Sequence, residues 1–141
     1  VFGVAEVALG LAADVGTLQR WPKITGNQSL VRELCLTGRN FDAATAQNLG
    51  LVSRIGNENE NVISTALHDI CAKIVPHSPV AVQGTKEALL YARDHSVADG
   101  LEQVAAYNAL ALQSDDLVAA WTARATKTKP RFADLPAFSK L

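Results

Sequence analysis

The segment Phe2–Gly16, FGVAEVALGLAADVG, holds the pattern from which we interpret the rest of the chain. Its first residues are apolar and rich in valine, which predicts a buried strand. Glu6 lies inside this run, where an unpaired carboxylate is costly to bury, and Asp14 closes the loop of small residues that follows. Two carboxylates placed in this way can share one apolar pocket and divide into a general acid and a general base. Glu6 and Asp14 are therefore the candidate catalytic residues.

Each of the two carboxylates also has a purely structural interpretation. A glutamate after a strand is typically a solvated edge residue, and an aspartate before a helix is typically the N-cap of that helix. The residue pattern by itself leaves both interpretations open.

The composition is that of an ordinary globular protein. The chain has 141 residues, of which 48% are hydrophobic and 19% charged, and its formal net charge is −1. This length is enough for one domain with a hydrophobic core. The balanced charge gives no sign of a surface for nucleic acid, and no run approaches the roughly 18 apolar residues that span a bilayer. We therefore predict no nucleic-acid partner and no membrane span.

The cysteines and histidines do not form a pattern of metal ligands. Cys35 and Cys71 lie in helix-like segments without metal-ligand spacing, and the three histidines do not cluster with them. We predict a pair of reduced, buried thiols and no metal site.

After Gly16 the pattern is mainly helical, with one short strand at 51–55. Pro22, Gly38 and Gly50 are predicted to end helices, and Asp42, Ser78 and Ser114 to begin them. The predicted helices cover 17–21, the stretch from a cap at Asn27 or Ser29 to Gly38, 43–49, 62–75, 79–93, 96–113 and 116–126. Residues 130–141 are expected to be extended.

The opening of the chain favours a piece of a larger protein. The sequence contains no methionine and begins abruptly in the predicted strand. One or two strands leave their backbone groups without partners, so we expect the missing strands upstream. We therefore interpret the chain as the carboxyl-terminal part of a longer one.

Four stretches together resemble the crotonase (enoyl-CoA hydratase/isomerase) family. They occur in the family's order and cover nearly the whole chain, which makes the combination specific although each stretch alone is weak. They are FGVAE with LGL (2–6, 9–11), LTGR with DA and GLVS (36–39, 42–43, 50–53), SPVAV with TK (78–82, 85–86), and SDD with KTKPRF (114–116, 127–132).

The resemblance implies an α/β fold, the ClpP/crotonase spiral. This chain would be its carboxyl-terminal portion, with one or two short strands and a helical trimerisation region. The implied division is a part of the spiral core at 1–76, a helical region at 77–132 and an extended tail at 133–141. The family forms trimers and hexamers, so a homo-oligomer is implied as well.

The resemblance is strongest to the branch of the family that moves double bonds in dienoyl thioesters. Its carriers are GLAADVGTLQR (10–20), GNQSLV (26–31) and YARDHSV (91–97), and hydratases typically have glycine where Asp14 stands. It implies conversion of 3,5-dienoyl-CoA to 2,4-dienoyl-CoA in fatty acid β-oxidation. Glu6 matches the family's glutamate and Asp14 the added aspartate of this branch.

The implied site is incomplete in this sequence. A third acidic residue and the amides of the oxyanion hole belong to the family's amino-terminal half. Val4, Leu9, Leu11 and Ala12 are expected to keep water from the carboxylates, with Leu11 and Ala12 in contact with substrate. The substrate is an acyl-CoA thioester, so no separate cofactor is implied. The alternatives are an enoyl-CoA hydratase, a Δ3-Δ2-enoyl-CoA isomerase, and a truncated module without catalysis.

Lys127 and Lys129 have two interpretations. They are either contacts to CoA phosphate or adenine, as similar lysines are in the family, or solvated cations at a helix end, where they suit the dipole.

The last three residues, Ser139-Lys140-Leu141, match a peroxisomal targeting signal. The alternative interpretation is a chance match. We predict an import receptor as partner and the peroxisome as location. A mitochondrial presequence would lie upstream of this sequence, so a mitochondrial location is kept as an alternative.

Overall fold

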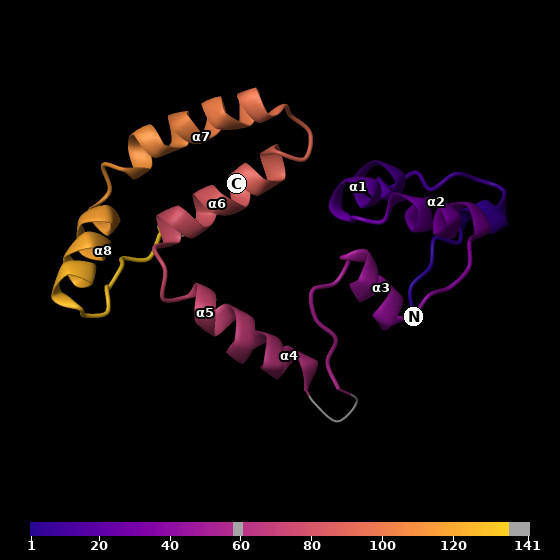
Figure 1. Ribbon diagram of the computed structural model, residues 1–141, viewed down its shortest axis with the longest axis horizontal. Coiled ribbons are helices and arrows are strands. Elements are labelled where there is room, and N and C mark those ends of the chain that lie inside the picture. The colour runs from indigo at the N-terminus through magenta and orange to yellow at the C-terminus, as the bar shows by residue number, and fades with distance from the viewer. Residues whose placement is uncertain (58–60, 136–141) are drawn as a thin grey trace. The chain divides into compact units, whose positions relative to one another are not determined.

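The computed structural model describes residues 1–57 and 61–135. Two compact units divide the chain, unit 1 at Val1–Asn59 and unit 2 at Glu60–Leu141, and each is described by itself (Figure 1). This division follows packing within the chain, whereas the predicted boundary after residue 76 concerns the complete spiral fold and stays a prediction. No helix of the described residues is long and apolar enough to cross a membrane.

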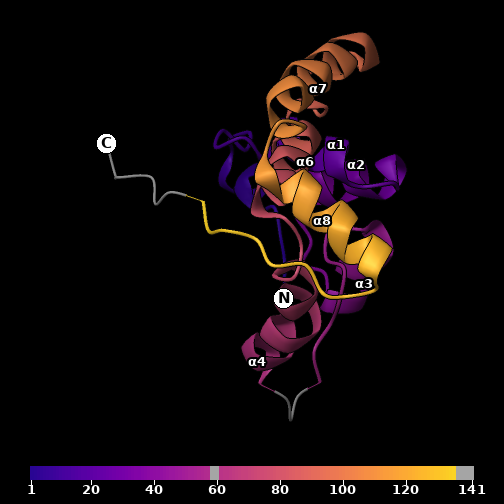
Figure 2. The same ribbon diagram turned by 90° about the vertical axis from the view of Figure 1, so that its left-hand side faces the viewer.

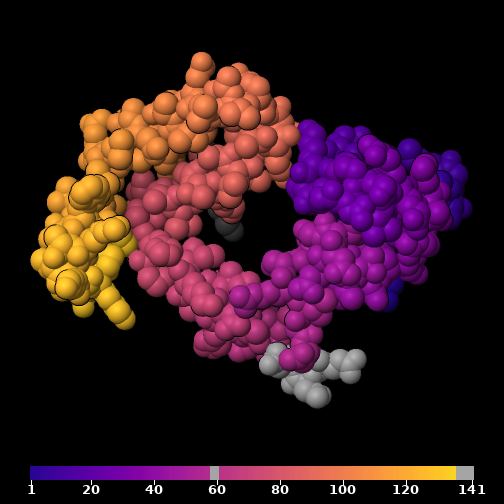
Figure 3. All heavy atoms as spheres, viewed as in Figure 1, coloured from indigo at the N-terminus to yellow at the C-terminus, as the bar shows by residue number. Residues whose placement is uncertain are grey.

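Unit 1 consists of short helices around an aromatic stack. Phe41 stacks with Phe2 at a ring-centroid distance of 5.5 Å and with Trp21 at 5.6 Å, and Val31 and Leu34 are fully buried beside them. Figure 3 shows unit 1, in indigo and purple, as one filled body. Its elements are a 3-10 helix at Glu6–Leu9 (η1) and the α-helices Thr17–Ile24 (α1), Gln28–Thr37 (α2) and Ala43–Leu49 (α3).

The helix ends of unit 1 confirm the predicted caps. Asn27 begins α2 by accepting a hydrogen bond from the backbone N–H of Leu30 at 3.1 Å. Asp42 begins α3 in the same way, with the N–H of Thr45 at 2.8 Å. Gly38 and Gly50 end the two helices in the left-handed region, with φ of 64° and 80°, which glycine adopts without a steric cost.

Pro22 does not end α1, contrary to the prediction, because side-chain donors beyond the helix hold the turn that contains the proline. The helix continues to Ile24. The hydroxyl of Thr25 donates to the carbonyl of Trp21 at 3.0 Å, and the Gln28 amide donates to the carbonyl of Pro22. Since Trp21 is anchored in the aromatic stack, the turn keeps its shape although proline lacks an N–H.

The predicted strands are largely replaced by other structure. Phe2 and Phe41 form one antiparallel bridge, with two backbone hydrogen bonds of 2.9 Å, and Glu6 then enters the 3-10 helix. Residues 51–55, all of them described, form no strand. Instead the N–H groups of Leu51 and Val52 donate to the carbonyl of Ala46 in α3, at 2.9 and 3.4 Å.

Unit 2 is helical over most of its length, as the sequence predicts. Helices α6 and α7 run side by side (Figures 1 and 2). Its elements are Val62–Ala66 (α4), a π-helical turn at Leu67–Cys71 (η2), Ala72–Ile74 (α5), Pro79–Tyr91 (α6), Val97–Ala111 (α7) and Asp115–Thr126 (α8).

Side-chain caps also begin α4, α6 and α7 of unit 2, whereas Ser114, the predicted cap of α8, begins that helix without a side-chain hydrogen bond. The hydroxyl of Ser78 accepts from the N–H of Ala81 at 3.1 Å and donates to the carboxylate of Asp116 at 2.6 Å, which ties the start of α6 to the first turn of α8. Ser96 and Asp99 form a reciprocal capping box at the start of α7. These hydrogen bonds satisfy backbone donors that the first helical turn leaves free.

Tyr107 joins α6 to α7. Its ring lies directly over Gly84, where a Cβ atom would collide with ring carbons. Its hydroxyl donates to the carbonyl of Val80 at 2.7 Å. The close approach of the two helices therefore requires glycine at position 84.

Candidate active site

Glu6 is the first residue of the 3-10 helix η1, and the turn that it begins is closed by backbone hydrogen bonds from residues 10 and 11. Gly10 ends the turn with φ of 83°, and its N–H donates to the carbonyl of Val7 at 3.3 Å. The N–H of Leu11 returns to the carbonyl of Glu6 at 3.2 Å. The side chain of Glu6 is half-buried, which argues against a fully solvated edge position.

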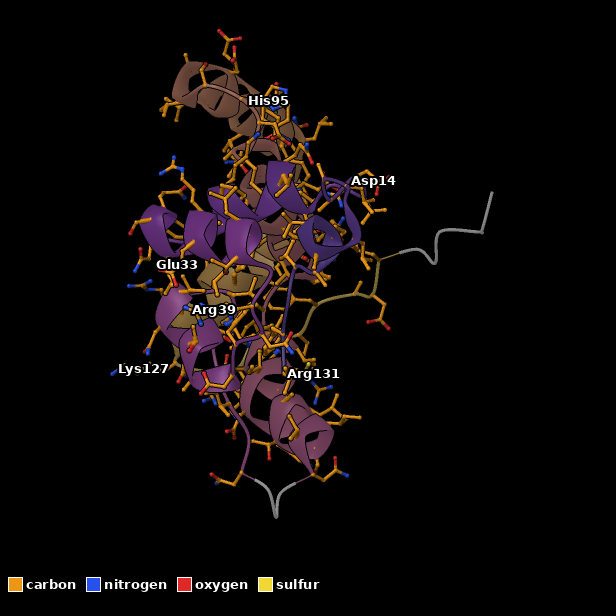
Figure 4. All side chains as sticks on the ribbon, turned by 90° about the vertical axis from the view of Figure 1, so that its right-hand side faces the viewer. Asp14, Glu33, Arg39, His95, Lys127 and Arg131 are labelled. Atoms are coloured by element: carbon orange, nitrogen blue, oxygen red, sulfur yellow. The ribbon has the colours of Figure 1, made fainter. Side chains whose placement is uncertain are left out.

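The segment that carries both carboxylates is attached to the core of unit 1 at two points. Val4 and Ala13 are buried there, one before Glu6 and the other directly before Asp14. Asp14 is exposed on the loop before α1 (Figure 4). Gly16, and not Asp14, is the N-cap of α1. The capping interpretation of Asp14 is therefore wrong, and the carboxylate is not used to begin the helix.

The negative charge of Glu6 acts on the thiol of Cys35 in α2. Burial raises the pKa of the Cys35 thiol, and the negative charge of Glu6 raises it further. The thiol therefore stays neutral beside the carboxylate. Cys35 is a free thiol and half-buried, whereas Cys71, also free, is exposed, so the predicted burial is wrong for Cys71.

The apolar residues around the carboxylates are placed differently from the expectation. Val4 is buried in the core, but Leu9 is 74% exposed, and Leu11 and Ala12 are exposed as well. The positions of this segment that face the core are taken by Val4 and Ala13. Consequently the described residues do not enclose the two carboxylates on the side of Leu9, Leu11 and Ala12.

Lys127 and Lys129 follow α8 in unit 2, on the other unit from the carboxylates. Lys127 has φ of 55°, in the left-handed region that a side chain disfavours. Its N–H donates to the carbonyl of Arg124 at 3.4 Å, and the N–H of Thr128 donates to that of Ala123 at 2.9 Å, which is a Schellman turn. Both lysines are exposed, and Figure 4 shows Lys127 at this helix end.

Sequence reasoning missed that Cys35 and Gly38 lie near the turn that carries Glu6 (η1, Glu6–Leu9), which is called the Glu6 turn below. Cys35 was treated only as a buried thiol, and Gly38 only as a helix cap. The LTGR stretch at 36–39 gave the one available signal, since it is part of the resemblance. The predicted address, Ser139-Lys140-Leu141, lies outside the described residues.

Comparison with known proteins shows the family to which this chain belongs. A family model described as enoyl-CoA hydratase/isomerase matches residues 1–135, and the chain belongs to this family. An enoyl-CoA hydratase structure from Mycobacterium tuberculosis H37Rv matches with a TM-score of 0.83 and 30% identity, over 94% of this chain and 51% of that one. The fold is therefore crotonase-like.

Similar curated proteins point to one branch of the family. The mitochondrial Delta(3,5)-Delta(2,4)-dienoyl-CoA isomerase of Homo sapiens is 56% identical over 117 residues, or 83% of this chain and 35% of that protein. The peroxisomal Delta(3,5)-Delta(2,4)-dienoyl-CoA isomerase of Arabidopsis thaliana is 46% identical over 137 residues, or 95% of this chain and 48% of that protein. The chain thus spans less than half the length of these relatives.

Proposed function

We propose that the whole protein isomerises 3,5-dienoyl-CoA to 2,4-dienoyl-CoA in the β-oxidation of unsaturated fatty acids. One observation carries the proposal: Glu6 and Asp14 lie on one segment that the core holds at Val4 and Ala13, and Asp14 does not cap a helix. The identities of 56% and 46% to proteins named dienoyl-CoA isomerases support the same reaction.

In the proposed reaction a proton moves along the conjugated chain. Glu6 takes a proton from C2 of the 3,5-dienoyl thioester, and the electrons of that C–H bond form an extended dienolate. Its negative charge lies largely on the thioester oxygen, where backbone amides of the amino-terminal half of the fold stabilise it. Asp14, in its acid form, returns a proton to C6, and the double bonds then stand at C2 and C4.

The conjugated intermediate explains why two carboxylates are needed. Its charge is delocalised from the oxygen to C6, so the proton leaves and enters at opposite ends of a flat system. One carboxylate cannot reach both ends, whereas two on the same segment of chain can divide the work of base and acid. Each would be restored by proton exchange before the next turnover.

The substitution Asp14→Asn in the full-length protein tests this assignment. It keeps the shape of the side chain but removes the proton donor, so the rate of 2,4-dienoyl-CoA formation should fall about 100-fold or more. Absorbance of the conjugated product measures this rate. Asp134→Asn, another exposed aspartate, serves as the control and should leave the rate unchanged. Full activity of Asp14→Asn would remove the residue from the mechanism.

An enoyl-CoA hydratase is the second candidate, and the similarity to a solved hydratase at a TM-score of 0.83 favours it. The two functions differ in their substrates. A hydratase adds water to 2-enoyl-CoA and leaves 3,5-dienoyl-CoA unchanged. Assaying the wild-type protein with both thioesters decides between them.

We further propose that Lys127 and Lys129 bind the phosphates of CoA, while Leu11 and Ala12 contact the acyl part. The left-handed backbone of Lys127 supports this. Glycine would adopt this turn without strain, whereas backbone strain of this kind tends to occur where a side chain has a functional role. Lys127→Gly should stabilise the folded state by about 1 kcal/mol and raise the KM for the CoA ester. A lower melting temperature, or an unchanged KM, would contradict the respective half of this prediction.

For the oligomer we propose a trimer or hexamer that covers the helices of unit 2. Large apolar side chains on these helices support it, among them Leu89 (68% exposed), Leu101 and Trp121 (72%). Partner strands for the segment around Phe2 would come from the amino-terminal half. A monomer in analytical ultracentrifugation of the full-length protein would contradict the oligomer.

We propose the peroxisome as the location, with the mitochondrion as an alternative. The sequence Ser139-Lys140-Leu141 supports the peroxisome and an import receptor as partner. The names of the relatives include both compartments, peroxisomal in Arabidopsis thaliana and mitochondrial in Homo sapiens. A fluorescent reporter carrying this tail should collect in peroxisomes, and a diffuse cytosolic signal would refute the address.

A further inference from the structure

Gly38 lies directly against the turn that carries Glu6. A Cβ atom built on Gly38 would lie 3.1 Å from Val7 Cγ1, 3.6 Å from the carbonyl oxygen of Val4 and 3.9 Å from Ala8 Cβ. All three atoms belong to the segment 4–8, which includes Glu6. The last two distances are ordinary contacts, so the tight one is to the side chain of Val7.

Gly38 stands at the end of α2, and this helix end is fixed more firmly than the turn that carries Glu6. Val31 and Leu34 anchor α2 in the core, and the N–H of Gly38 donates to the carbonyl of Leu34 at 3.1 Å. The guanidinium of Arg39 reaches back to the carboxylate of Glu33 at 2.8 Å, across the end of the helix (Figure 4). A side chain at position 38 would therefore displace the turn and leave α2 in place.

Gly50 offers a matched comparison within the same unit. It ends α3 with φ of 80°, so a side chain there meets the same backbone strain as at Gly38. No atom of the described residues lies within 4 Å of a Cβ placed on Gly50. The two glycines thus share the conformational requirement and differ in what lies above them.

We propose that Gly38 is a positioning residue for Glu6. The lack of a side chain lets the Glu6 turn rest on the end of α2, and this contact sets the position of the carboxylate relative to the substrate carbon. The proposal rests on the proposed function, because it assigns Glu6 the proton transfer at C2.

The experiment compares Gly38→Ala with Gly50→Ala in the full-length protein. Both variants should lose stability because both place alanine at a positive φ, and Gly38→Ala should lose more because of its contact with Val7. Only Gly38→Ala moves the Glu6 turn, by a few tenths of an ångström, and its kcat should fall about tenfold with little change in KM. Gly50→Ala should keep the wild-type kcat. Equal kcat values in the two variants would overturn the proposal.

A second-site variant separates the contact from the backbone strain. In the double variant Gly38→Ala/Val7→Ala the atom at 3.1 Å is gone, so the turn can return to its place, and Val7→Ala alone is the reference. The double variant should recover kcat to the value of Val7→Ala, while its unfolding midpoint stays low because the strain at position 38 remains. A kcat that stays low overturns the contact as the cause.

A structural measurement keeps the two proposals distinguishable. If wild-type protein fails to isomerise 3,5-dienoyl-CoA, the proposed function fails, and the role of Gly38 in that reaction fails with it. If the wild type is active, crystal structures should place the Glu6 Cα differently in Gly38→Ala and unchanged in Gly50→Ala. An unmoved Glu6 in Gly38→Ala then overturns the positioning role and leaves the proposed function standing.

Discussion

Unit 1 and unit 2 bury their apolar side chains to very different degrees. Unit 1 places Val31, Leu34 and Leu49 out of contact with water around its aromatic stack, whereas Ala123 alone is a buried apolar residue among the described residues of unit 2. Hydrophobic burial is the main favourable term in folding. The comparison teaches that unit 1 draws its stability from a core of its own, while unit 2 depends on caps and on the packing of Tyr107 against Gly84, with its large apolar side chains exposed.

Truncating one leucine in each unit should sharpen this comparison most. Leu34→Ala leaves a cavity in the core of unit 1, and we expect the free energy of unfolding to fall by about 3 kcal/mol. Leu89→Ala in α6 of unit 2, as the matched change, should cost about 0.5 kcal/mol or less in the monomer. Urea unfolding measures both, and a larger loss for Leu89→Ala would show that this side chain is covered.

The contact of Gly84 with Tyr107 is the next largest effect, and it tests the one tight helix pair of unit 2. Gly84→Ala would force the ring of Tyr107 away, which should cost about 2 kcal/mol. Gly100→Ala, in α7, meets no atom of the described residues and should stabilise the helix by about 0.5–1 kcal/mol. Thermal melts of the two variants should therefore shift in opposite directions. A shift in the same direction would contradict the packing described for Tyr107.

The capping box of α7 gives the smallest effect and a defined pH dependence. Hydrogen bonds from the hydroxyl and the backbone N–H of Ser96 lower the pKa of Asp99. A carboxylate whose pKa is lower in the folded state stabilises that state above its unfolded pKa of about 3.9, and loses this contribution as the pH falls through the folded pKa. The difference in melting temperature between wild type and Asp99→Asn should therefore be present at neutral pH and shrink below about pH 4.

Asp42 offers the corresponding control in unit 1. Hydrogen bonds from Thr45 lower the pKa of Asp42 in the same direction. Asp42→Asn should show the same acid dependence as Asp99→Asn. A difference between wild type and Asp99→Asn that does not change with pH would contradict the charged cap at α7.

The sequence predicts the parts of this fold that depend on neighbours in the chain. Asn27, Asp42 and Ser78 were predictable as caps because each binds a backbone N–H three residues further on, whereas Ser114 precedes its helix without such a bond. The strand at 51–55 was not, because a strand is defined by a partner and these residues find the end of α3 instead. Pro22 misled for a similar reason, since the side chains of Thr25 and Gln28 hold the turn that contains it, at the carbonyls of Trp21 and Pro22.

The candidate site, too, has features that depend on neighbours in the chain and features that depend on distant contacts. Glu6 and Asp14 are candidates from their places in an apolar run and a small-residue loop, and from the resemblance. The contact of Gly38 with Val7 joins residues far apart in the sequence, so no local pattern reveals it. Leu9, Leu11 and Ala12, expected to keep water from the carboxylates, are exposed among the described residues, because the core takes Val4 and Ala13 from this segment.

The two tryptophans of the chain stand one in each unit, and this gives the protein two built-in optical reporters. Trp21 is buried in the aromatic stack, so its indole should emit at short wavelength until unit 1 unfolds. Trp121 faces solvent on α8, so its emission should be red-shifted and open to quenching by iodide until another surface covers it. With Trp21→Phe and Trp121→Phe, fluorescence alone can follow the melting of unit 1 and the burial of Trp121 in the proposed oligomer.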